Sequence, residues 1–188
     1  MILKKLRQQT SERHTATESR LPLVDPALSR AGYAEIVERI YGFYLPLEAR
    51  LLAAPFWNEI GFEIEARRKV SRLEWDLQKL SEDAGLTRLP RCAELPEIVS
   101  PAQALGCLYV VEGATLGGQV ITKHLQKNLG ITPETGGAFF AGYGAETGSR
   151  WQEFGAMITA QAERLGQDDV IVASANRTFA TLEHWLFR

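Results

Sequence analysis

The chain has 188 residues, of which 45% are hydrophobic and 23% charged, and its formal net charge at pH 7 is −2. A chain of this length is expected to form one domain, residues 1–188, that buries about 70% of its unfolded surface without disulfides or structural metals. The balanced charge, with no basic stripe or charged tail, argues against a nucleic-acid-binding protein, and no stretch approaches the ~20 apolar residues of a membrane span.

The N-terminal residues and the cysteines indicate the compartment. Residues 1–7 lack the continuous apolar core of a signal peptide. The two cysteines, Cys92 and Cys107, do not have the spacing of a metal site. Free cysteines are typical of a reducing environment. The expected location is therefore the cytoplasm, without membrane association.

The first predicted helix carries a histidine on its apolar face. At about 100° per residue, one stripe of this helix holds Leu3, Leu6, Thr10, His14, Thr17 and Leu21. His14 lies near the centre of the stripe, and Glu18 follows at i+4, where its carboxylate can reach the imidazole and fix its tautomer. Arg7 lies two turns earlier on the same side. The pattern fits a metal ligand, although a histidine on an apolar face is more often a satisfied core residue.

Helical periodicity continues through the next part of the chain. Residues 31–54 carry apolar side chains along one helical face, with Pro46 as the expected kink. Residues 62–84 form a packing seam with alternating spacings of 4 and 3, and Gly85 is expected to end this helix. The seam consists of Ala66, Val70, Leu73, Leu77, Leu80 and Ala84.

The longest predicted helix has the clearest start signal. Ser100 is a good N-cap residue, a proline follows at the first helical position, and Gln103 completes a capping box. The apolar pattern then runs to about residues 128–130.

Three glycines lie near the middle of this helix: Gly113, Gly117 and Gly118. Each glycine costs a helix roughly 1 kcal/mol relative to alanine. Because glycine has no Cβ, the backbone can approach a partner closely, and the helix can kink there. The partner is either another helix, which is the commoner case, or a planar cofactor.

The C-terminal third completes an all-α pattern. Residues 131–146 read as a glycine-rich loop, and two helices follow near residues 147–166 and 168–187. Almost no segment alternates like a strand. We therefore predict an all-α protein with about seven or eight helices.

Two separated segments, residues 6–18 and 112–120, together resemble the heme oxygenase family. The similarity is to the bacterial members that supply biliverdin to phytochromes. A weaker similarity extends through residues 41–48, residues 138–140 and the terminal helix, and so covers most of the chain. The resemblance implies the helical fold of the family, with heme between the first helix and a kinked, glycine-rich distal helix.

The resemblance also implies roles for individual residues. His14 corresponds to the ligand of the heme iron and Glu18 to its supporting carboxylate. The expected catalytic residues of the distal helix are Gly113, Thr115 and Gly117. The expected heme contacts are His14, Glu18, Arg7, Gly113, Gly117, Gly118 and Arg150.

The match to the family pattern is incomplete at two places. Arg7 and Arg150 correspond roughly to basic positions that hold the heme propionates, but Ala156 occupies another such position. Many members carry an aspartate that organises water near bound oxygen, where this chain has Ala114. The nearby polar candidates for that network are Glu112, Thr115 and Gln119.

The activity implied by the resemblance is the oxidative cleavage of heme b to biliverdin, with release of carbon monoxide and ferrous iron. Heme would be both cofactor and substrate, together with molecular oxygen. No flavin or nicotinamide fingerprint is present, so electrons would come from a separate reductase or ferredoxin. A phytochrome is an expected acceptor of biliverdin.

Two other functions fit the same residues. A heme carrier or sensor would bind at His14 without turnover, and Ala114 is the residue that favours it. A cofactor-free helical scaffold of the same fold would use the glycines only for helix packing.

Overall fold

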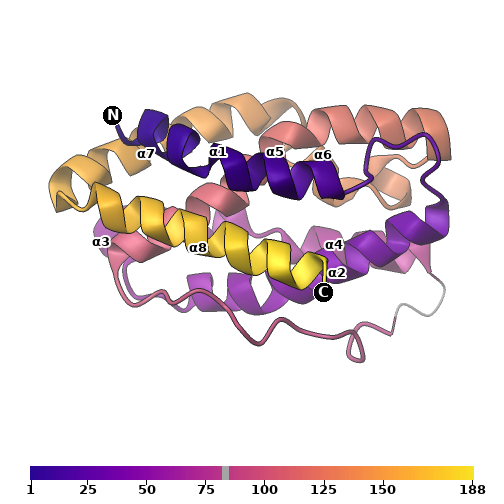
Figure 1. Cartoon of the computed structure of the whole chain (residues 1–188), viewed down its shortest axis with the longest axis horizontal. Coiled ribbons are helices and arrows are strands. Elements are labelled where there is room, and N and C mark those ends of the chain that lie inside the picture. Colours follow the sequence, from indigo (N-terminus) through magenta and orange to yellow (C-terminus); the bar gives the residue numbers. More distant parts are fainter. Residues whose placement is uncertain (82–84) are drawn as a thin grey trace.

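Figure 1 shows a computed structural model of the chain, which describes residues 1–81 and 85–188. These residues contain helices and no strand, so the all-α prediction is confirmed. The eight α-helices among them are α1 (Ile2–Arg20), α2 (Arg30–Leu52), α3 (Trp57–Ile60), α4 (Val70–Leu80), α5 (Pro101–Leu129), α6 (Ala138–Ala141), α7 (Thr147–Leu165) and α8 (Asp168–Leu186). The 3-10 turns are η1 (Ile64–Arg67), η2 (Pro133–Thr135) and η3 (Gly144–Glu146).

Local sequence signals set both ends of the long helix α5. The Ser100 hydroxyl accepts a hydrogen bond from the backbone N–H of Gln103 (3.3 Å), and the Gln103 side chain accepts one from the N–H of Val99 (2.9 Å). At the other end Gly130 takes a left-handed conformation with φ 65°, which glycine adopts without a steric penalty. Both boundaries agree with the prediction.

α5 is long and apolar enough to qualify as a membrane-spanning helix, contrary to the expectation from the sequence. However, 56% of its most apolar window is buried within the protein. It packs chiefly against α8, and at Gly106 its backbone approaches the carbonyl group of Ile171. α5 is therefore a core helix, and it packs against α8, α6, α7 and α2.

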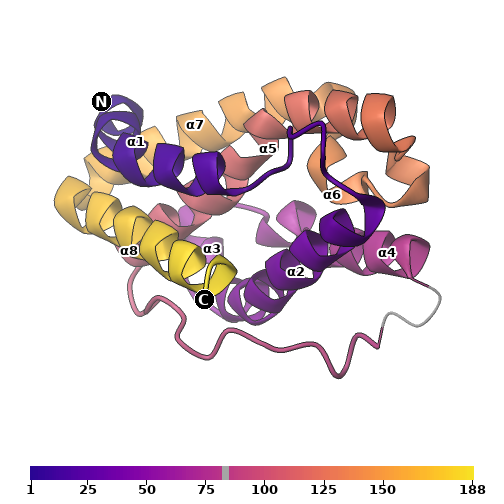
Figure 2. The same cartoon turned by 45° about the vertical axis from the view of Figure 1, so that its right-hand side comes forward.

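α1 lies along the outside of this core. Figures 1 and 2 both show α1 and α8 side by side, and α1 packs chiefly on α8 and next on α7. Its buried residues are Ile2, Leu6, Thr10 and Thr17. Leu3 and Leu21 are partly buried against the core, so every residue of the predicted stripe except His14 is packed.

The helix predicted over residues 62–84 begins later, at Val70. The preceding residues form η1, and Ala66 is exposed. The carboxylate of Glu48 in α2 accepts hydrogen bonds from the N–H groups of Val70 and the residue before it (3.0 and 2.5 Å). This long-range cap fixes where α4 starts. Ala84, the last residue of the predicted seam, lies outside the described residues.

Two further boundaries differ from the prediction. α4 ends at Leu80, where Ser81 takes extended angles (φ −137°, ψ 136°), rather than at Gly85. Residues 131–146, predicted as a loop, contain η2, α6 and η3. The carboxylate of Asp76 in α4 accepts hydrogen bonds from the first two N–H groups of α6 (2.7 and 2.8 Å). α6 therefore depends on a partner that is distant in the sequence.

Candidate functional site

His14 of α1 is exposed, although Thr10 and Thr17 on the same stripe are buried. Its side chain is 48% exposed, and Nδ1 lies 3.3 Å from Oε2 of Glu18, as the i+4 spacing predicts. The imidazole lies edge-on to the ring of Phe179 in α8, with centroids 5.8 Å apart. Because Glu18 holds Nδ1, Nε2 is the nitrogen available to a ligand. A satisfied core histidine would be buried with its polar atoms bonded, so His14 is not a core histidine and its Nε2 is open to a ligand.

One face of α5, which we call the glycine face, is apolar and open. At 100° per residue it holds Gly113, Leu116, Gly117 and Val120. Leu116 and Val120 are 45% and 66% exposed, and a Cβ built on Gly113 would find no atom within 4 Å. An exposed apolar stripe beside the buried side of this helix indicates a binding surface.

The glycine face lies opposite the histidine of α1. A Cβ built on Gly117 would lie 3.7 Å from Oε1 of Glu18, whose other oxygen contacts His14. The structure therefore brings three predicted site residues together: the imidazole, its carboxylate and one distal glycine.

Tyr109 is a neighbour of the candidate site that the sequence reasoning missed. It lies one turn before Gly113 on the same side of α5, half-buried, and its ring is 6.1 Å from that of Trp151 in α7. Burial raises the pKa of Tyr109, while Thr10 and Arg7 of α1 act in the opposite direction. Tyr109 thus links α5 to α1, and its i−4 spacing from Gly113 could have indicated this.

These residues fit a heme group. No group of three or more His, Cys, Asp or Glu side chains in the described part of the chain could hold a bare metal ion. A lone half-exposed histidine suits iron that a porphyrin already carries. The glycine face offers a flat apolar surface opposite it, and the exposed Arg7 offers a positive charge for a propionate.

Gly118 and Thr115 do not belong to the glycine face. A Cβ on Gly118 would run into the backbone carbonyl of Phe140 in α6, so this glycine permits helix packing. Thr115 is buried, donates a hydrogen bond to the carbonyl of Glu112 (2.7 Å) and lies about 200° around the helix from Gly113. This geometry does not support a heme contact at Gly118 or a catalytic role for Thr115, and both stay predictions.

Arg150 also lies elsewhere. Its Nε is 3.3 Å from Oε2 of Glu146, and its guanidinium group lies 5.8 Å from the ring centre of Tyr143. Its backbone carbonyl accepts a hydrogen bond from Arg67 (3.1 Å). These contacts belong to the side of α5 that carries Glu112. The structure therefore does not bring Arg150 to His14, whereas Arg7 lies on the same helix as His14.

Glu112 itself is at the centre of a buried ionic cluster. Its carboxylate is 3.0 Å from Nη1 of Arg67 and 2.5 Å from Nζ of Lys69, and it accepts a hydrogen bond from the Tyr143 hydroxyl (2.8 Å). Burial lowers the pKa of Lys69, and Glu112 opposes that change. Both Glu112 oxygens are engaged, so the distal water role considered for this residue does not fit its position.

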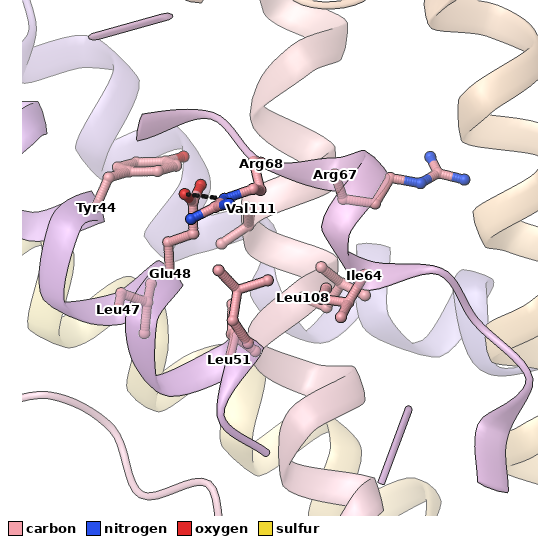
Figure 3. Close-up of a pocket in the computed structure, with 10 residues that line it drawn as sticks. Tyr44, Leu47, Glu48, Leu51, Ile64, Arg67, Arg68, Leu108 and Val111 are labelled. Carbon is pink, nitrogen blue, oxygen red and sulfur yellow. Dashed lines mark ion pairs between the residues drawn. The ribbon is translucent and has the colours of Figure 1, made fainter. Parts of the chain in front are cut away.

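A small cavity lies between α2, η1 and α5, away from His14. Figure 3 shows apolar side chains such as Leu47 and Val111 around it, the ion pair of Glu48 with Arg68 (3.6 Å) at its edge, and Arg67 pointing out of it. Its volume of about 10 Å³ is close to the least that holds one water molecule. It is too small for a cofactor.

Comparison with known proteins identifies the family and the fold of the whole chain. A model of the heme oxygenase family matches residues 1–188, whereas no curated protein matches the sequence. The fold is similar to that of the heme oxygenase of Neisseria meningitidis, solved with NO and CO bound, with a TM-score of 0.79 and 22% identity over 99% of this chain and 90% of that chain.

Two other solved structures are similar in the same way. The heme oxygenase of Leptospira interrogans gives a TM-score of 0.76 and 19% identity over 98% of each chain. Heme oxygenase-1 of the cyanobacterium Synechocystis, in complex with heme, gives 0.70 and 20% identity over 98% of this chain and 90% of that chain. At these identities the structures establish the fold, and the family model extends over the whole sequence. The chain belongs to the heme oxygenase family of enzymes.

Proposed function

We propose that this chain binds heme b between α1 and α5 and opens the ring to biliverdin, releasing carbon monoxide and ferrous iron. The observation that carries the proposal is the half-exposed His14–Glu18 pair opposite the open glycine face. When bound and reduced, heme supplies an iron that binds oxygen and a porphyrin ring that is itself oxidised.

The residues of the site lie on two helices with different roles, α1 on the side of the iron ligand and α5 on the opposite side. His14 presents Nε2 as the ligand, and Glu18 accepts the hydrogen bond of Nδ1–H, which fixes the orientation of the ring. Gly113 and Gly117 present backbone instead of side chains on the opposite side, which leaves room for a small ligand close to the ring. Leu116 extends the apolar surface and limits the access of water.

Arg7 orients the bound group in this proposal. It is an exposed cation on the same helix as His14 and lies near Tyr109. A guanidinium group pairs well with a carboxylate such as a heme propionate. The rotation of the ring, and with it the position of cleavage, would follow from this contact.

The remaining partners follow from the chemistry. Electrons come from a separate reductase or ferredoxin, because the sequence carries no flavin or nicotinamide fingerprint. A phytochrome is a suitable acceptor of the product. A cytoplasmic location agrees with the two cysteines, Cys92 and Cys107, which are buried and free.

One observation favours a second function. Ala114 gives the distal helix an apolar side chain where many relatives have an aspartate that organises water. A heme carrier or sensor would need no such network.

The experiment adds hemin to the protein and then a reductant under air. A Soret band that converts to the spectrum of biliverdin, with release of carbon monoxide, is the expected result. A stable complex of ferrous heme with oxygen would instead identify a carrier. Absence of hemin binding would refute both functions and leave a helical scaffold.

A further inference from the structure

The buried ionic cluster around Glu112 lies immediately before the first glycine of the glycine face. Glu112 is 1% exposed, and Arg67 and Lys69 are 3% and 2% exposed. Arg67 also pairs with Glu153 of α7 (2.7 Å). Lys69 further donates hydrogen bonds to the Arg67 carbonyl (3.2 Å) and the Tyr143 hydroxyl (2.9 Å). The cluster therefore ties α5 to η1, to the start of α4 and to α7.

The glycine face has few other anchors. Nothing packs within 4 Å of the Cβ position of Gly113, and Ala114 and Leu116 are exposed. The next tight contact along α5 is that of Gly118 with the Phe140 carbonyl. Between these points Thr115 is also buried, but Glu112 provides the charged contacts that hold this part of the helix to its neighbours.

We propose that Glu112 is a positioning residue whose hydrogen bonds from Arg67, Lys69 and Tyr143 together fix the rotation and height of the glycine face over the bound substrate. The inference rests on the proposed function, because the glycine face matters for catalysis only if a planar substrate lies against it. Directional charge-assisted hydrogen bonds to three donors specify an orientation that apolar packing alone would not.

The charges of the cluster determine which substitution can test the role of Glu112. The cluster buries one carboxylate against two cations, so Glu112→Gln would remove the carboxylate partner of buried Lys69, leave Arg67 paired with Glu153 alone, and risk unfolding the protein. Tyr143→Phe removes a single hydroxyl that donates to Glu112 (2.8 Å) and leaves both ion pairs in place. Tyr41→Phe is the matched control, because the Tyr41 hydroxyl donates to the carboxylate of Glu74 (3.2 Å) between α2 and α4.

Amide hydrogen exchange of the heme-free variants is the first measurement. In Tyr143→Phe we expect the amides of residues 113–118 to exchange roughly 10-fold faster, while those of α8 keep their rates. In Tyr41→Phe the same amides should change less than about 2-fold. Unchanged exchange at 113–118, or an equal increase along every helix, would overturn the inference.

The second measurement is the ratio of biliverdin isomers formed from hemin. We expect it to change in Tyr143→Phe and to stay at the wild-type value in Tyr41→Phe. An unchanged ratio in both variants would overturn the link to substrate position. Failure of the wild-type protein to cleave hemin would refute the proposed function, and the exchange data would still decide whether Glu112 anchors the glycine face.

Discussion

Gly113→Ala and Gly118→Ala make the same chemical change five residues apart on α5, and the structure predicts opposite effects on stability. Neither glycine has a positive φ. A Cβ at position 113 meets no atom within 4 Å, so alanine gains up to ~1 kcal/mol of helix propensity. For a chain of this size, that gain raises the melting temperature by about 2–4 °C.

At position 118 the new Cβ meets the carbonyl oxygen of Phe140. This atom belongs to the backbone and cannot rotate away, so overpacking should cost about 1–3 kcal/mol. The melting temperature of Gly118→Ala should therefore fall by roughly 2–12 °C.

The expected order in activity is the reverse of that in stability, because the more stable variant, Gly113→Ala, should lose more activity. A methyl group at position 113 projects from the glycine face, so Gly113→Ala should lower the yield of biliverdin per bound heme on the order of tenfold or more. Thermal unfolding followed by circular dichroism, and a single-turnover assay with hemin, give both quantities for each variant. A destabilised Gly113→Ala with normal yield would refute the assignment of an open cofactor face.

Two further predictions concern a ligand and a cap. His14→Ala should abolish biliverdin formation and the optical spectrum of histidine-ligated heme, while the helical circular dichroism stays intact because His14 is half-exposed. The control His184→Ala should keep biliverdin formation and the histidine-type spectrum. A histidine-type spectrum in His14→Ala would refute the assignment. Burial raises the pKa of Asp76 to about 6 from an ordinary value near 3.8. The folded state therefore holds this proton more tightly, and the contribution of Asp76 to stability should fall, on the order of 3 kcal/mol, as pH rises from about 4 to 6. Urea unfolding across this range should show a flatter dependence for Asp76→Asn, and parallel curves for the two proteins would contradict the prediction.

The sequence predicted those elements whose signals are local. Ser100 and Gly130 mark the ends of α5 because a cap acts through backbone groups within one helical turn. The His14–Glu18 contact was equally predictable, since both residues lie one turn apart on one helix.

The predictions that failed depended on contacts between distant segments. The apolar spacing of residues 62–84 continues across η1, but Glu48 caps α4 at Val70, and periodicity carries no information on that contact. Gly118 looked equivalent to its neighbours because its partner is the backbone of Phe140, in a segment that the sequence predicted as loop. The position of a residue on its helix could thus be predicted from the sequence, but the segment that packs against that residue could not.

A crystal structure of the hemin complex tests the central claim most directly. We predict iron bound to Nε2 of His14, with Nδ1 still held by Glu18 and the backbone at Gly113 and Gly117 over the opposite side of the ring. Iron bound to another histidine, or heme lying away from the glycine face, would contradict the account.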